Sequence, residues 1–174
     1  MVNKIKFLIL LLLGILAGFN IFLTFILAPT IFSKFDSRLA GEVMNSIFPY
    51  YFASGWIIGL IVYSLIAILS IKNKTIINKL KIPIIALSIL IISYMALHKT
   101  VFPLGQATIN KYYALKDSGK IEDAENLKDK FKNIHTISSI LNMINLILVI
   151  FLLYSIYYKL NEKEENKKTL RRDL

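Results

Sequence analysis

The chain has 174 residues, of which 56% are hydrophobic and 18% charged, with a formal net charge of +10 and a mean hydropathy of +0.60. The absence of cysteine excludes disulfides, thiolate metal sites and cysteine nucleophiles. The basic residues are not interleaved with aromatic ones as on nucleic-acid-binding surfaces, so we expect no nucleic-acid partner.

Four apolar segments account for the hydrophobic excess. They comprise residues 5–26, 52–71, 82–101 and 137–158. Each is nearly free of charge and has the length that a helix needs to cross a hydrocarbon core of about 30 Å. They are apolar on nearly every side and lack the period of two that is typical of barrel strands. The sequence therefore predicts an all-α, integral membrane four-helix bundle within residues 1–160.

The first segment follows Lys4 and Lys6 and resembles a secretory signal in that respect. Its apolar run of about twenty residues is longer than a signal core, and no A-x-A cleavage site follows it. We therefore expect the segment to be retained as a true membrane span. Asn20 is a polar residue within it and is a candidate for the interior of the bundle.

Two G-x-x-x-G patterns concern assembly. The first span contains Gly14 and Gly18, and the second contains Gly55 and Gly59. Small residues at this spacing let two helix backbones approach closely. The patterns favour packing within one bundle, for example of the first span against the second, and homodimerisation is the alternative.

An aromatic cluster precedes the second span. Phe48-Pro49-Tyr50-Tyr51-Phe52 follows a stretch with charges of both signs. Proline favours the first turn of a helix, and aromatic residues gather at membrane interfaces. The cluster predicts a helix start marked by Pro49, with Tyr51 and Phe52 in an interfacial aromatic belt.

The remaining connections differ in character. Residues 72–81 predict a short basic turn between antiparallel helices. Before the fourth span, four apolar residues recur at i, i+3, i+7 and i+10, which predicts an additional outer amphipathic helix over about 121–135: Ala124, Leu127, Phe131 and Ile134. Residues 161–174 are a charged tail without apolar periodicity. No internal repeat is evident, although a faded duplication of a helical hairpin stays open.

Charge predicts the orientation. With four spans both termini share one side, which carries twelve Lys and Arg against four acids, whereas the other side carries nine against seven. The positive-inside rule places both termini in the cytoplasm, as for a multi-pass protein of the plasma (cytoplasmic) membrane. The lipid bilayer, with anionic lipids at the cytoplasmic face, is therefore the expected partner, and a homo-oligomer or a membrane partner is possible.

A polar stripe in the fourth span is the best candidate for a functional surface. Its residues share one helix face: His135, Ser138, Asn142 and Asn145. Amide and imidazole groups are costly in lipid, so this face is expected to point into protein or water. No acidic residue lies within a span, which weighs against a proton-driven transporter.

Histidine and methionine open a second possibility. His98 and His135 are both expected near the outer membrane face, and Met95 lies one turn before His98. Imidazole and thioether suit Cu(I), and histidine can ligate haem between the helices of a bundle. The plainer interpretation is that both histidines hydrogen-bond to neighbours. The sequence requires no cofactor, so copper and haem are candidates only.

The chain resembles the transmembrane protein 205-like family of small membrane proteins. The resemblance rests on Gly18-Phe19, on Ala28-Pro29-x-Ile31-Phe32, on Ala40-Gly41 to Phe48-Pro49-x-Tyr51-Phe52, and on Phe131-x-x-x-His135-x-x-Ser138-x-x-x-Asn142. It implies a four-span protein with a domain of unknown function. Together with the absence of hydrolase and nucleotide-binding motifs, it favours a non-enzymatic protein that binds or passes a solute, or organises a partner, through the polar stripe.

Overall fold

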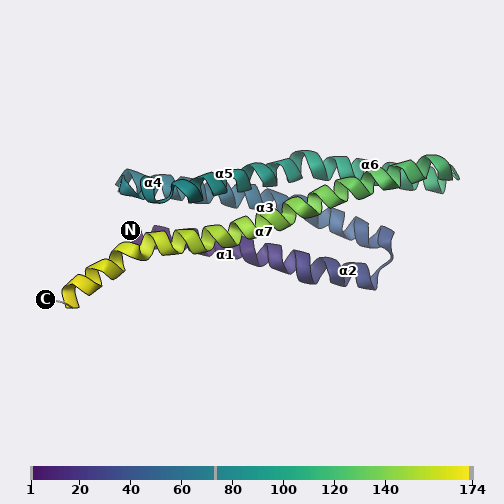
Figure 1. Ribbon diagram of the computed structural model, residues 1–174. Helices are drawn as coiled ribbons and strands as arrows, with labels where there is room; N and C mark the ends of the chain where they lie inside the picture. Colours follow the sequence, from purple (N-terminus) through teal and green to yellow (C-terminus); the bar gives the residue numbers. More distant parts are fainter. Residues whose placement is uncertain (1, 73, 173–174) are drawn as a thin grey trace.

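The computed structural model describes residues 2–72 and 74–172, with side chains described for residues 2–71 and 74–160. The chain forms helices in this order: α1 Val2–Ile21, η1 Phe22–Leu27, α2 Ala28–Lys34, α3 Ser37–Lys72, α4 Thr75–Lys79, α5 Lys81–Ala96, η2 Leu97–Val101, α6 Phe102–Asp117 and α7 Ile121–Arg172 (Figure 1). The segments η1 and η2 are π-helical turns that continue the α-helices on either side.

Four helical runs are long and apolar enough to cross a membrane. They are Val2–Lys34, Ser37–Ile71, Lys81–Asp117 and Ile121–Leu160. The prediction of an all-α membrane bundle is confirmed. At 1.5 Å per residue each run is roughly 50–60 Å long, so each extends beyond a hydrocarbon core of about 30 Å. The amphipathic segment at the start of α7 continues into the fourth span without a break.

The predicted helix start at Pro49 is wrong. Helix α3 begins at Ser37, where Asp36 Oδ1 accepts hydrogen bonds from the backbone N–H groups of Arg38 (3.0 Å) and Leu39 (3.1 Å). Pro49 lies inside this helix and removes one backbone donor. Packing on both sides holds the helix through the proline, because Met44 and Phe52 are both buried.

Two prolines follow the π-helical turns. Pro29 and Pro103 each lie at the second residue of the helix after the turn. A proline ring presses on the preceding turn, and a turn widened by one residue relieves this crowding. The wide turns are closed by bonds over five residues, from the N–H of Ala28 to the carbonyl of Leu23 and from the N–H of Phe102 to that of Leu97.

These features repeat along the chain at an interval of 74 residues. The wide turns, the prolines and the buried positions of α1 and α5 all match at this interval. Ile9, Leu13, Leu16, Ala17, Asn20 and Leu23 are buried, and so are their counterparts Pro83, Leu87, Leu90, Ile91, Tyr94 and Leu97. The first hairpin (α1 to α3) and the second hairpin (α5 to α7) therefore share one architecture, although no repeat is evident in the amino-acid sequence.

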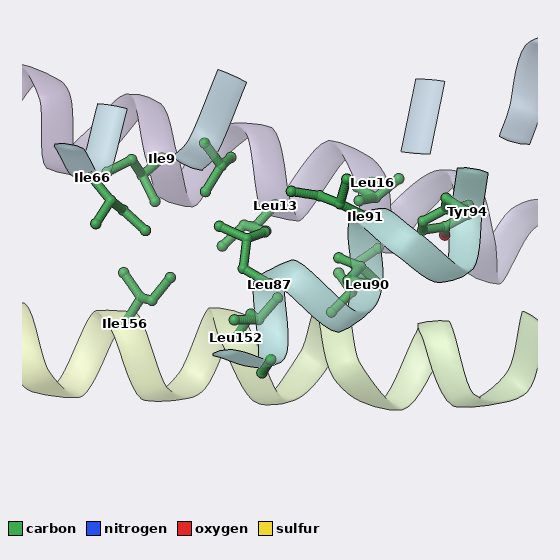
Figure 2. Packing of buried hydrophobic residues seen from close by; sticks show 14 of the residues in the cluster. Ile9, Leu13, Leu16, Ile66, Leu87, Leu90, Ile91, Tyr94, Leu152 and Ile156 are labelled. Atoms are coloured by element: carbon green, nitrogen blue, oxygen red, sulfur yellow. The ribbon is translucent and has the colours of Figure 1, made fainter. Parts of the chain in front are cut away.

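The two hairpins interlock as a four-helix bundle. Helices α1 and α5 each pack against both α3 and α7. The N-terminus, the C-terminal end of α7 and α4 lie at one end, whereas α2 and α6 diverge at the opposite end, which we name the distal end (Figure 1). Toward the termini, fully buried Leu13, Leu87, Leu152 and Ile156 meet between the helices (Figure 2).

The two glycine patterns differ in their surroundings. A Cβ atom at Gly55 would overlap the ring of Tyr94, and one at Gly59 would lie 2.6 Å from Ile91 Cγ1. Gly14 and Gly18 are exposed, and a Cβ atom on either would meet no heavy atom within 4 Å. The close approach within the chain is therefore between α3 and α5, the second and third spans, rather than between the first and second.

Candidate functional site

Five polar side chains form a closed set of hydrogen bonds between the four spans, which we name the polar ring. Asn20 Nδ2 donates to the Tyr94 hydroxyl (3.1 Å), and the Tyr51 hydroxyl donates to Asn142 Oδ1 (2.7 Å). Asn142 Nδ2 donates to Thr24 Oγ1 (3.0 Å), and Thr24 Oγ1 donates to Asn20 Oδ1 (3.3 Å). The two tyrosine hydroxyls lie 3.5 Å apart and close the ring.

The direction of the closing bond follows from the other four. The Tyr51 hydroxyl has one hydrogen, and the Asn142 carbonyl oxygen accepts it. Tyr94 therefore donates to Tyr51, and every member of the ring donates one bond and accepts one. Bonds that run in one direction polarise one another and strengthen the set. The ring is thus a neutral, closed set of hydrogen bonds in the interior of the bundle.

A cleft of about 830 Å³ opens at the distal end, and we name it the distal cleft. Its lining side chains come from residues 23–32, 37–52, 101–117 and 131–143, so both hairpins contribute to its walls. Thr24 and Asn142 belong both to the polar ring and to this lining. These two residues of the polar ring therefore form the floor of the distal cleft.

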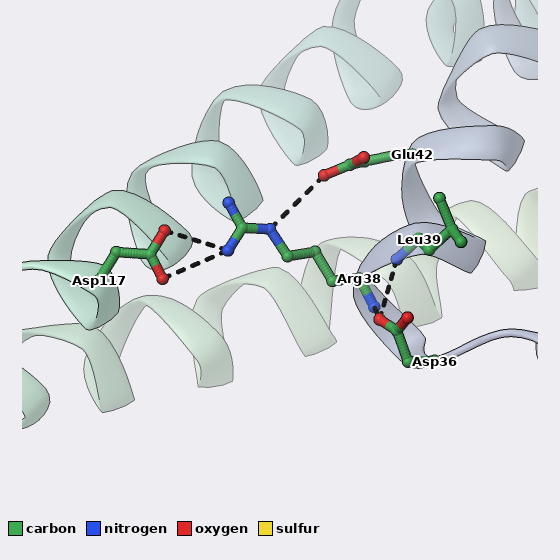
Figure 3. A network of polar contacts seen from close by, with 5 residues as sticks. All are labelled: Asp36, Arg38, Leu39, Glu42 and Asp117. Atoms are coloured by element: carbon green, nitrogen blue, oxygen red, sulfur yellow. Dashed lines mark hydrogen bonds and ion pairs between the residues drawn. The ribbon is translucent and has the colours of Figure 1, made fainter.

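Three charged side chains stand at the rim of the distal cleft, and Arg38 binds the two acids, Glu42 and Asp117 (Figure 3). Arg38 Nη1 lies 3.0 and 3.2 Å from the two carboxylate oxygens of Asp117, and Arg38 Nε lies 3.5 Å from Glu42 Oε1. The Arg38 guanidinium also lies 4.7 Å from the ring centroid of Tyr113. These contacts link the start of α3 to the end of α6 and so join the two hairpins across the cleft.

A family model described as a domain of unknown function (DUF4149) matches residues 11–108, more than half of the chain. The chain belongs to the DUF4149 family. The matched residues of this DUF4149 protein contain four members of the polar ring and end before Asn142 on α7. No curated protein and no solved structure matches it.

The four residues of the predicted polar stripe lie in different surroundings in the DUF4149 protein. His135, exposed, and Ser138, half-buried, line the distal cleft, and Asn142 belongs to its floor. His135 also stacks on Phe131, with ring centroids 6.0 Å apart. Asn145 is fully buried one turn further along α7, and its amide has no hydrogen-bond partner among the described residues.

The predicted metal ligands have separate partners. His98 Nδ1 accepts a hydrogen bond from Trp56 Nε1 (3.1 Å), and the two rings stack. His98 does not line the distal cleft, whereas His135 does. Met95 is 43% exposed on the outer surface of its helix. Within the described residues, no three His, Cys, Asp or Glu side chains gather where they could hold a metal ion.

The predicted interface residues also lie elsewhere than expected. Tyr51 and Phe52 are 5% and 3% exposed, so they are interior residues and not members of a lipid-facing belt. The Phe52 ring stacks with that of Phe48, with the ring centroids 5.5 Å apart, and also contacts the ring of Tyr51. Asn20 and Asn142 are predictable from the sequence because amides stand out in apolar runs. The roles of Tyr51 and Tyr94 were missed, since tyrosine is common at interfaces.

Proposed function

We propose that this DUF4149 protein is a non-enzymatic membrane protein that binds a small solute in the distal cleft, with the polar face of α7 as one wall. The observation that carries the proposal is the shared position of Thr24 and Asn142 in the polar ring and in the cleft lining. Because the hydrogen bonds of the polar ring hold these two side chains in place, a bound molecule would meet polar groups in fixed positions. Pockets of about 300–1,000 Å³ suit small ligands.

The core favours binding over passage. Between the polar ring and the termini, the bundle is filled by buried aliphatic side chains such as Leu13, Leu87 and Leu152 (Figure 2). A path for a polar solute requires hydrogen-bonding groups or water along its length. Such groups are gathered on the distal side of the ring. On the other side the Asn145 amide is followed by mainly aliphatic side chains, with Ser70 and Ser155 as buried polar residues near the termini. The cleft therefore acts as a blind pocket in this conformation.

The position of the protein in the cell belongs to the same proposal. The resemblance to the transmembrane protein 205-like family and the excess of basic residues near the termini support a plasma-membrane protein with both termini in the cytoplasm. The distal cleft then opens toward the outer side. Anionic lipids would contact the basic end, where Lys6 Nζ already binds the backbone carbonyl of Leu160 (2.9 Å).

Copper or haem handling gains no support from the arrangement of its candidate ligands. His98 is bonded to Trp56, and His135 faces a cleft that lacks His98. The distal cleft and its hydrogen-bonded floor support the solute-binding function instead.

Ser138→Phe tests the proposal, because this side chain lines the cleft and belongs to no hydrogen bond of the polar ring. The matched control is Ile140→Phe on the same helix, where the side chain is 55% exposed on the outer surface. Protein purified from membranes is analysed by native mass spectrometry for small molecules that remain bound. We expect a bound molecule in the wild type and the control, and its loss in Ser138→Phe. A wild type free of any such molecule, or an equal load in Ser138→Phe, would contradict the proposal.

A further inference from the structure

Five uncharged polar side chains face the distal cleft without engaging one another. They come from α3, α6 and α7, and none takes part in a side-chain hydrogen bond within the described residues: Asn45, Gln106, Asn110, His135 and Ser138. Amides, hydroxyls and a neutral imidazole both donate and accept hydrogen bonds. Their hydrogen-bonding capacity is therefore available to a molecule that enters the cleft.

The charged side chains of the cleft are already engaged at its rim. Among the residues that line it, Arg38, Glu42 and Asp117 carry charge, and Arg38 pairs with both acids, which leaves a net charge of −1 on this exposed set. An anionic head group inside the cleft would lose water and find no free cation. A cationic head group would find only the exposed carboxylates that Arg38 already binds, where solvent weakens the attraction. A neutral head group would lose only hydrogen bonds to water, which the five uncharged side chains can replace.

The remaining wall is apolar and aromatic. Phe48, Phe52 and Phe102 form one cluster, with Phe102 centred 6.3 Å from each of the other two rings, and Phe131 lines the α7 side. This surface suits hydrocarbon, whose transfer from water is favourable by about 0.8 kcal/mol for each buried CH₂ group. The cleft thus offers hydrogen bonds to one part of a ligand and hydrocarbon contact to another.

We infer that the ligand of the distal cleft is an uncharged amphiphile, with hydroxyl and carbonyl oxygens in its head and a hydrocarbon chain. A monoacylglycerol has this chemistry. The head lies among the five uncharged side chains, and the chain lies against the phenylalanine cluster. The inference rests on the proposed function, since it names the class of molecule that the same cleft accepts.

Three amphiphiles with hydrocarbon chains of the same length distinguish a neutral head group from an anionic and a cationic one. They are a monoacylglycerol, the fatty acid as its carboxylate, and the alkylammonium. The full chain is held in phosphatidylcholine nanodiscs at pH 8, and bound amphiphile is titrated by native mass spectrometry. We expect the monoacylglycerol to bind at least about tenfold more tightly than either charged analogue. Ser138→Phe abolishes this binding, and Ile140→Phe leaves it unchanged.

Gln106→Lys adds a directional test, because Gln106 is exposed in the cleft and outside the polar ring. A cation there is expected to raise the affinity for the fatty acid and to lower that for the alkylammonium. If a charged analogue binds the wild type best and Ser138→Phe abolishes it, the ligand class is wrong and the binding cleft stands. If Ser138→Phe changes the binding of none of the three, the inference and the proposed function both fail.

Discussion

The Asn142 amide connects three helices at once, because its oxygen accepts from Tyr51 and its nitrogen donates to Thr24. An unpaired amide in lipid has no water to bond to and costs free energy, and the neighbours of Asn142 remove this cost by bonding to it. The neighbours are in turn satisfied by Asn20 and Tyr94. The stability of each member therefore depends on members that it does not touch.

This dependence gives a prediction for Thr24→Val and Tyr94→Phe, two changes that remove hydroxyl groups and preserve shape. The two side chains share no hydrogen bond, yet both bind Asn20. We expect their effects on the free energy of unfolding to be non-additive by about 0.5–2 kcal/mol, since the first change already opens the ring. Unfolding in mixed micelles measures the effect of each single and of the double variant.

Ser88→Ala is the control for this cycle, because its hydroxyl bonds to the carbonyl of Ile84 within its own helix. Its effect is expected to add to that of Tyr94→Phe within about 0.5 kcal/mol. Additive effects of Thr24→Val and Tyr94→Phe would show that the five bonds act independently.

At the scale of the elements, the sequence predicted the spans well and their breaks poorly. An apolar run of twenty residues has few alternatives to a membrane helix, so the spans followed from composition. Pro49 was misread because proline is common at helix starts and tolerable inside a helix that is packed on both sides. No residue type marks the π-helical turns at Phe22–Leu27 and Leu97–Val101, since the same residue types form ordinary α-helix elsewhere.

The candidate site was predictable in part for a related reason. Asn142 and Asn20 were found because an amide in an apolar segment has to be satisfied by something. Which partners satisfy it depends on how the helices rotate about their axes, and that rotation is decided by contacts such as Gly55 against the Tyr94 ring. The sequence contains both residues, 39 positions apart, with no pattern that links them.

The π-helical turns themselves give a prediction. Pro29→Ala restores a backbone donor and removes the ring that crowds the preceding turn. We expect the turn to become α-helical, so that α2 rotates by about one residue, roughly 100°, relative to α1. Because the chain has no native cysteine, a single cysteine at Phe32, now 50% exposed, reports the rotation as a change in its rate of labelling.

Pro49→Ala is the matched control, because it restores the same donor in a helix without a wide turn. Labelling of a cysteine at Tyr50, which is 79% exposed beside it, is expected to stay the same. Equal labelling at position 32 with and without Pro29 would mean that the wide turn does not depend on the proline.

At the scale of the whole molecule, the match between the hairpins gives a prediction about chain order. The N-terminus, the described end of α7 and helix α4 lie at one end of the bundle (Figure 1). A permuted chain that begins at Thr75, continues through a flexible linker to Met1 and ends at Lys74 keeps every helix and the polar ring intact. We expect it to unfold in mixed micelles at the same denaturant fraction as the parent, to within experimental error.

The contrasting permutant opens the chain at Ser118, in the turn between α6 and α7, and so moves one pair of ends to the distal side. This chain has to cross the membrane with its hairpin divided, and we expect a lower yield in the membrane fraction. Equal yields for the two permutants would show that the hairpins are not independent units.

The repeated hairpin also bears on how the protein enters the membrane. Each hairpin leaves the end that holds the termini and returns to it, and each has lysines of its own there, Lys4 and Lys6 in the first and Lys79 and Lys81 in the second. Basic residues beside a span favour the cytoplasmic side. We therefore expect each half to carry an orientation signal of its own, so that reversing the charges of one half leaves the insertion of the other unchanged.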